Sequence, residues 1–187
     1  MEIIDLCNTE VSERPVQESA VLMRAIDDYI NSERYRYQHM TIREVRDSLL
    51  SEYNYQNRAA YRSCRPFGLT IAPGDICYID FGRAYTSEVG YQHFGLVISI
   101  FNGKAFVVPM TSNFNAYQQA YDPLFNPEGI RHLMRLGKIE GLYKYSVLFL
   151  NDAKYINMAR IIEIKAHLST ASRLFVFLEQ LFIVGLG

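Results

Sequence analysis

Two polar segments beside neighbouring apolar runs hold the residue types that could do chemistry. The loop Gly82–His93 carries Arg83, Glu88 and His93, and the pair Thr111–Ser112 ends an apolar run further along the chain. A histidine can exchange a proton near neutral pH, and a hydroxyl group can donate a hydrogen bond. We expect these two segments to emerge from the ends of adjoining strands and to face each other across a working surface.

Each of these residues also has a purely structural interpretation. A histidine that precedes Phe94 is often a packed or capping residue, and Thr111–Ser112 after a strand is an ordinary strand terminator. Glu88 fits a carboxylate that structures its loop. The residues alone leave both interpretations open.

The elements that position these segments are three short runs rich in Ile, Val, Phe and Tyr. They cover Asp75–Phe81, Phe94–Phe101 and Lys104–Met110. Asn102–Gly103 separates the last two runs, and this dipeptide is typical of a two-residue hairpin turn that needs positive φ at both positions. We therefore predict three neighbouring antiparallel strands.

The amino-terminal third has a helical pattern. Apolar residues from Leu22 to Ile30 recur at a spacing of three and four, which predicts a helix from Val16, and Asn31–Gln38 reads as a polar break. Thr41–Glu44 has the sequence of a capping box and predicts the start of a second helix. We expect the two helices to form a hairpin.

Arginines alternate with tyrosines near the end of the second predicted helix. Arg58, Arg62 and Arg65 lie among Tyr55 and Tyr61. Such a pattern can bind RNA by charge and stacking. It equally fits a solvated helix face whose tyrosines pack inward.

The chain after Ser112 combines a long irregular stretch with two more strands and a helix. We expect an elaborated loop over Asn113–Tyr145, strands at Tyr145–Leu150 and Arg160–Lys165, and a connector at Asn151–Met158 between them. Ser169 or Thr170 could cap a final helix that is apolar around much of its circumference, as in a buried helix or a dimer contact.

These elements predict an α+β fold with a small, strongly bent antiparallel β-barrel, an N-terminal helical hairpin and a C-terminal helix. Two prolines and a glycine between Pro66 and Pro73 mark the boundary. We predict a helical N-terminal extension over residues 1–68 and a barrel domain over residues 69–187, with a long insertion at 113–144.

Composition excludes several classes of protein. The chain has 187 residues, a net charge of −1, 49% hydrophobic residues and three cysteines. The cysteines are widely spaced without a CxxC pair, which argues against a disulfide framework and a structural zinc. We find neither a membrane-spanning run nor a signal peptide, so we expect a soluble, cytoplasmic protein with no membrane partner.

The order of the motifs resembles the MazF/PemK/Kid family of toxin–antitoxin ribonucleases from about Thr70 onward. That family has a Gly-Asp-[Ile/Val] strand, a loop ending in Arg-Pro, a strand ending in Thr or Thr-Ser, a Ser-x-[Leu/Val]-x-Leu strand and a strand near Arg-[Leu/Ile]. The corresponding segments here are Gly74–Ile76, Thr86–Phe94, Pro109–Ser112, Ser146–Leu150 and Arg160–Ile162. The family's loop arginine is His93 in this chain, and its proline is Phe94.

The resemblance implies an SH3-like barrel and a metal-independent endoribonuclease, without a cofactor, that cuts single-stranded RNA. The ribose 2′-OH would attack the adjacent phosphate and leave a 2′,3′-cyclic phosphate. His93, Thr111 and Ser112 take the catalytic positions. A histidine in place of arginine shifts the role from electrostatic clamp toward acid–base catalysis.

Other residues could bind the substrate in such an enzyme. Arg83, Arg131 or Arg135 could supply the missing fixed charge. Glu88 could orient His93 or close the loop on its backbone amides.

The resemblance also implies partners and alternatives. Its partners would be single-stranded RNA, a cognate antitoxin protein and a second copy of the chain in a homodimer. The alternative is a non-catalytic SH3-like barrel that binds a protein or nucleic acid, and this class includes a toxin that poisons gyrase.

Overall fold

The computed structural model describes residues 6–9 and 12–184. The chain divides into two compact units, Met1–Arg46, called here the amino-terminal unit, and Asp47–Gly187, called the sheet unit. Residues 1–5 and 10–11, which belong to the predicted N-terminal extension, lie outside the described residues.

The amino-terminal unit contains the short 3₁₀ helix η1 (Val16–Glu18), helix α2 (Ala20–Gln38) and the start of α3. Ser19 caps α2, since its side chain accepts the amide of Leu22 at 3.3 Å. The expected break at Asn31–Gln38 is wrong, because α2 continues through it and an ion pair of 2.8 Å joins Glu33 to Arg36 one turn apart. Helix α2 has no buried residue.

Helix α3 (Ile42–Arg58) begins with the predicted capping box, which is confirmed. The Thr41 hydroxyl accepts the amide of Glu44 at 3.3 Å, and the Glu44 carboxylate accepts the Thr41 amide at 2.8 Å. Hydrogen bonds from the side chain and the backbone of Thr41 favour the charged carboxylate and lower the pKa of Glu44.

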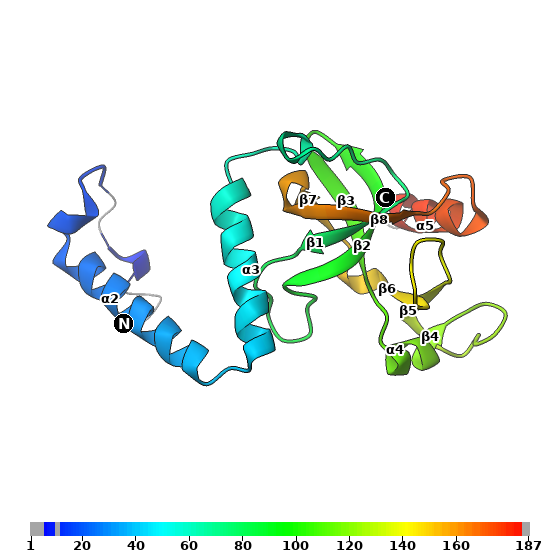
Figure 1. Cartoon of the computed structure of the whole chain (residues 1–187), viewed down its shortest axis with the longest axis horizontal. Coiled ribbons are helices and arrows are strands. Elements are labelled where there is room, and N and C mark those ends of the chain that lie inside the picture. Colours follow the sequence, from blue (N-terminus) through cyan, green and yellow to red (C-terminus); the bar gives the residue numbers. More distant parts are fainter. Residues whose placement is uncertain (1–5, 10–11, 185–187) are drawn as a thin grey trace. The chain divides into compact units, whose positions relative to one another are not determined.

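The described part of the sheet unit contains one sheet of eight strands, and Figure 1 labels them. Their order is β4-β5-β6-β3-β2-β1-β8, and β7 pairs with β3 beside this path. Asn102 and Gly103 have φ of 47° and 76° and form the predicted β2–β3 hairpin, which is confirmed. The strands are β1 (Asp75–Asp80), β2 (Gln92–Phe101), β3 (Lys104–Thr111), β4 (Ala120–Tyr121), β5 (Ile130–Gly137), β6 (Ser146–Phe149), β7 (Lys154–Asn157) and β8 (Ile161–His167).

The expectation of a small closed antiparallel barrel of SH3 type is wrong. The sheet is open, with β4 at one end of the path and β8 at the other, and it is mixed because β4 and β5 run parallel. The segment expected to be a loop contains helix α4 (Phe114–Gln119), β4 and β5. These strands extend the sheet beyond β6 and leave its two edges apart, which is the physical reason for the difference.

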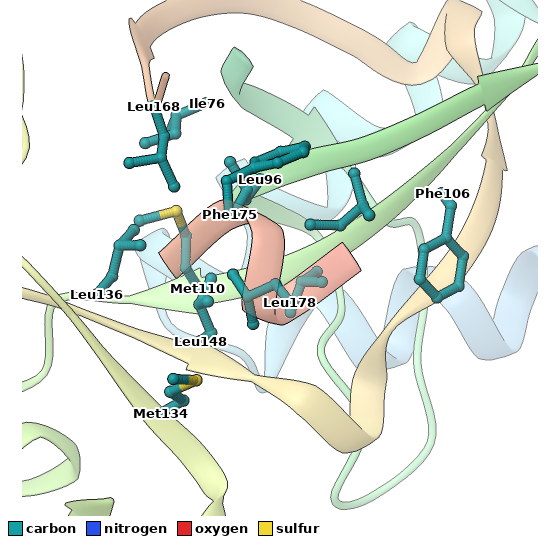
Figure 2. Packing of buried hydrophobic residues seen from close by; sticks show 12 residues of the cluster. Ile76, Leu96, Phe106, Met110, Met134, Leu136, Leu148, Leu168, Phe175 and Leu178 are labelled. Atoms are coloured by element: carbon teal, nitrogen blue, oxygen red, sulfur yellow. The ribbon is translucent and has the colours of Figure 1, made fainter. Parts of the chain in front are cut away.

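Three clusters of buried apolar side chains pack on the sheet within the described residues, and the two larger ones form cores on its opposite faces. Helix α5 (Arg173–Val184) covers one face, and Figure 2 shows Phe175 and Leu178 pointing toward Leu96 and Met110. The helix begins after Ser172, whose hydroxyl accepts the amide of Phe175 at 3.2 Å, rather than after the expected Ser169 or Thr170.

The other core is built around β1, β7 and the segments that flank them. It contains the buried thiols Cys64 and Cys77 together with apolar side chains. The intervening 3₁₀ helices are η2 (Arg65–Phe67), η3 (Leu150–Asp152) and η4 (Met158–Arg160). No helix of the described segments is long and apolar enough to cross a membrane.

A buried polar network joins the carboxyl half of α3 to the end of β1. Asp80 is only 2% exposed, and its carboxylate accepts hydrogen bonds from Ser51 at 2.5 Å, Asn54 at 3.1 Å and Gln92 at 3.1 Å. A buried carboxylate requires such donors, because an unpaired charge in the interior is strongly unfavourable. This half of α3 is therefore part of the sheet unit (Figure 1).

Candidate functional site

The strand register brings the two predicted catalytic segments together. The pairing of β2 with β3 ends at Phe94 and Met110, and continuation of this register by one position places His93 opposite Thr111. Opposed residues of such a pair project on the same face, with Cβ atoms about 4.5–5.5 Å apart. His93 and Thr111 are thus neighbours at one end of the sheet.

This pair belongs to a row that crosses five strands. His93 pairs with Ile79 on one side, Thr111 pairs with Val147 on the other, and Val147 pairs with Arg135. The row therefore places an imidazole, a hydroxyl and a guanidinium on one face of the sheet, with Val147 between the last two.

A hydrogen bond fixes the orientation of the His93 ring. Its Nδ1 lies 2.8 Å from the carbonyl oxygen of Gly90. A carbonyl oxygen can only accept, so Nδ1 carries the hydrogen, and in the neutral ring Nε2 is left as a proton acceptor. His93 is partly buried. The geometry suits a general base as well as a packed residue.

The loop that carries His93 is closed at its base. The Tyr91 amide donates to Gly82 at 2.6 Å, and the Phe81 amide donates to Tyr91 at 2.7 Å. Gly90 makes the close approach possible, because a Cβ atom there would lie 2.7 Å from the Ala84 side chain. The chain thus holds His93 at a defined position at the start of β2.

The end of β3 is also organised by hydrogen bonds. The Thr111 hydroxyl oxygen accepts the amide of Asn113 at 3.2 Å, and the Asn113 side chain caps α4. A hydroxyl that accepts through oxygen still has its hydrogen to donate. Thr111 therefore terminates the strand and can donate to a ligand at the same time, and Ser112 beside it is exposed.

The predicted substrate-binding residues differ in their hydrogen bonds and in their exposure to solvent. Arg135 donates from Nε to Tyr117 at 2.9 Å and from Nη2 to Gln118 at 3.3 Å, so it holds the end of α4. Arg83 and Arg131 are exposed. Glu88 accepts the amide of Tyr85 at 3.3 Å and so closes the loop tip, and no hydrogen bond joins it to His93 in the described part of the chain.

A cavity of about 380 Å³ lies beside the end of β3, and its size is suited to a small molecule or a nucleotide unit. Thr111 and Ser112 line it together with two cations, Lys144 and Lys165, and the Lys165 ammonium forms an ion pair of 2.5 Å with Glu163. Phe94 and Met110 also line it, so it borders the face opposite to His93. Thr111–Ser112 thus lies between the imidazole and the cavity.

The two lysines and the histidine–carboxylate pair of His167 and Asp75 were not expected from the sequence. His167 Nδ1 lies 2.8 Å from the buried carboxylate of Asp75 and ties the end of β8 to the start of β1. Lys144 stands between Tyr143 and Tyr145, a cation–aromatic alternation that could have marked it. Lys165 and His167 carry no local signal, because the fold alone brings Lys165 to the cavity and His167 to Asp75.

Comparisons with known proteins identify no family. No model of a protein family matches the chain, and no curated protein is significantly similar to it. The resemblance to MazF/PemK/Kid toxins stays a hypothesis that rests on the quoted motifs.

Proposed function

We propose that the protein is an endoribonuclease that cuts single-stranded RNA by attack of the ribose 2′-OH on the adjacent phosphate. The observation that carries the proposal is the cross-strand position of His93 and Thr111 at one end of the sheet. A proton acceptor and a hydroxyl donor within one strand spacing fit the two needs of this reaction, removal of a proton and stabilisation of phosphoryl charge.

The reaction assigns one role to each side chain. His93 Nε2 takes the proton of the 2′-OH, the 2′ oxygen forms a bond to phosphorus, and the bond to the 5′ oxygen breaks. The proton passes from the imidazolium to the departing 5′ oxygen, so that the products are a 2′,3′-cyclic phosphate and a 5′-OH. Thr111 donates its hydroxyl hydrogen to a non-bridging oxygen, and Ser112 stands beside it.

Cations and partners complete the proposal. Lys144 and Lys165 in the neighbouring cavity, with the exposed Arg83 and Arg131, would attract the RNA backbone. Neither the base nor the hydroxyl donor requires a cofactor. A cognate antitoxin and a homodimer belong to the same proposal, through the resemblance alone.

The test is cleavage of a mixed-sequence RNA by purified protein in EDTA. We expect fragments that end in cyclic phosphate, no cleavage of DNA of the same sequence, and losses of at least about 100-fold in His93→Ala and Thr111→Ala, because each removes a proton acceptor or a charge-stabilising donor. His39→Ala and Thr170→Ala, matched changes at exposed positions outside the site, should stay within about two-fold.

A second candidate is non-catalytic binding of nucleic acid or protein. It is favoured by the contacts of Arg135, which hold this arginine within the protein. Its guanidinium donates to two backbone carbonyls and lies 4.6 Å over the Tyr117 ring. Intact RNA at micromolar protein would support this candidate and reject the nuclease. Cleavage that survives both site substitutions within a few-fold would remove His93 and Thr111 from the mechanism.

A further inference from the structure

A second cavity, of about 170 Å³, lies where the carboxyl half of α3 meets the sheet. Its lining combines two guanidiniums, two amides and one buried carboxylate. The polar residues are Asn54, Arg58, Asp80, Asn157 and Arg160, and Tyr55 stands at its wall. Its volume is below the roughly 300–1,000 Å³ of pockets for drug-sized ligands, so it suits a small polar group.

Backbone carbonyls hold both guanidiniums in place. Arg58 Nη1 donates to Ile161 at 2.7 Å and to Ala159 at 3.4 Å, and its guanidinium lies 4.1 Å over the Phe67 ring. Arg160 Nη1 donates to the carbonyl of Asp80 at 3.3 Å. The two charged groups are therefore preorganised, which lowers the entropy cost of binding a ligand.

These bonds leave donors unused. A guanidinium has five N–H donors, and among the described residues both arginines donate through Nη1 alone, so Nε and Nη2 of each are left for a ligand. Within residues 6–9 and 12–184, no carboxylate forms an ion pair with Arg58 or Arg160. Two partly buried cations without an anionic partner thus line one small cavity.

The carboxylate of Asp80 offsets only one of the two positive charges. Its Oδ1 accepts from Ser51, Gln92 and the Gly82 amide, and its Oδ2 accepts from Asn54, so hydrogen bonds within the protein already stabilise it. Two guanidiniums and one carboxylate leave one net positive charge. This balance favours a singly charged oxyanion and disfavours a cation.

We infer that this cavity binds a phosphate group through Arg58 and Arg160. The planar fork of a guanidinium matches the oxygens of a phosphate, and the Asn54 and Asn157 amides are further polar groups of the lining. Arg58 belongs to the segment in which arginines alternate with tyrosines. The proposal gives this segment a phosphate ligand in addition to its packing role.

The cavity lies at the same end of the sheet as His93. Ile79 of β1 pairs with His93 of β2 and with Ile161 of β8, the residue after Arg160. Two strand spacings, about 10 Å, therefore separate the positions of His93 and Ile161. Assignment of the phosphate to an RNA chain rests on the proposed function, whereas binding of the oxyanion itself does not.

The first experiment titrates the full chain with inorganic phosphate by calorimetry, at an ionic strength held constant with sodium chloride. We expect saturable binding that Arg160→Gln weakens at least about ten-fold, because a charge-assisted hydrogen bond is lost. Arg160→Lys should weaken it less, and Arg173→Gln, the same change at an exposed position on α5, should leave it unchanged. Arg58→Lys provides a second variant if Arg160→Gln unfolds, as judged by thermal unfolding.

The second experiment measures binding of a 2′-deoxy oligonucleotide, which cannot be cleaved by this mechanism. If Arg160→Gln binds the oligonucleotide more weakly, and the slope of log K against log salt concentration is smaller by about one, the cavity is assigned to a nucleic-acid phosphate. If Arg160→Gln loses inorganic phosphate but binds the oligonucleotide as the native protein does, the cavity is assigned to a free phosphate compound.

Absence of saturation by phosphate overturns the inference. So does a phosphate affinity of Arg160→Gln and Arg58→Lys that equals the affinity of the native protein. Failure of the nuclease proposal would appear separately, as intact RNA in the cleavage assay with phosphate binding retained.

Discussion

At the scale of single residues, burial decides which side chains are chemically accessible. Cys7 is exposed, whereas Cys64 and Cys77 are fully buried in the core that contains β1 and β7. Burial, with a smaller contribution from the negative charge of Asp75, raises the pKa of Cys77 to about 12, and burial also raises the pKa of Cys64. Folding thus favours the neutral thiol of Cys77. The contribution of this thiol to the stability of the fold is complete below pH 9 and is lost as the pH rises toward 12.

We predict that one of the three thiols reacts rapidly with a disulfide reagent in the native protein at pH 8. The thiolate is the attacking form, and buried thiols with raised pKa values supply little of it. Absorbance of the released thiol should report one fast equivalent, and three after denaturation. Cys7→Ser should abolish the fast phase. Rapid reaction of two or three thiols in native protein would contradict the burial of Cys64 and Cys77.

At the scale of elements, local hydrogen bonds fix the first turn of α3, whereas tertiary contacts hold its carboxyl half. Its first turn is fixed by the reciprocal bonds of Thr41 and Glu44, whereas Ser51 and Asn54 bind Asp80 from about 26–29 positions away in the sequence. Gln92, next to His93, donates to Ser51 at 2.8 Å as well as to Asp80. The end of α3 therefore contributes to the position of the strand that carries His93.

We predict that the first turn of α3 loosens in acid. The folded pKa of Glu44 is lowered, so the stabilisation by its carboxylate is present above pH 4.5 and is lost as the pH falls through the folded value. Glu44→Gln should have weaker helical NMR shifts than the native chain at Thr41–Val45 at pH 7, and the two proteins should converge at pH 3. Arg43→Gln, an exposed neighbour, is the control. A difference that persists unchanged at pH 3 would contradict the role of the carboxylate.

At the scale of the whole molecule, the division into units cuts through α3. The sheet unit begins at Asp47, within α3, and includes the helix residues that satisfy the Asp80 carboxylate. The Asp80 carboxylate is 2% exposed in the whole chain, and removal of these residues would take away two of its donors. Stability of the sheet unit therefore depends on the carboxyl half of the helix.

We predict that a fragment of residues 40–187 unfolds cooperatively and that a fragment of residues 69–187 is much less stable. Each lost hydrogen bond to a charged buried group costs about 1.5–3 kcal/mol, and two such losses correspond to a fall in Tm of about 6–20 °C. Calorimetry of both fragments provides the measurement. Asn57→Ala in the longer fragment, at an exposed α3 residue, controls for general effects on the helix. Equal Tm values would show that α3 is dispensable for the sheet.

Features that depend on a few consecutive residues were predictable from the sequence. The Asn102–Gly103 hairpin follows from backbone conformation, and the Thr41–Glu44 cap follows from bonds three residues apart. The apolar runs also indicated β1, β2, β3, β6 and β8. The extent of α2 was missed because its polar end has helix-forming side chains but no apolar period.

The sequence by itself determined these local elements and the hairpin that brings His93 near Thr111–Ser112. A register shift between Val97 and Ser99, which the turn does not encode, then sets which of these residues lies opposite His93. Only the tertiary structure decided that β4 and β5 extend an open sheet, that Asp80 is buried against α3, and that Arg58 and Arg160 share a cavity. The physical reason is distance along the chain. Strand pairing and burial join side chains up to about 100 positions apart, and no local pattern encodes which of them meet.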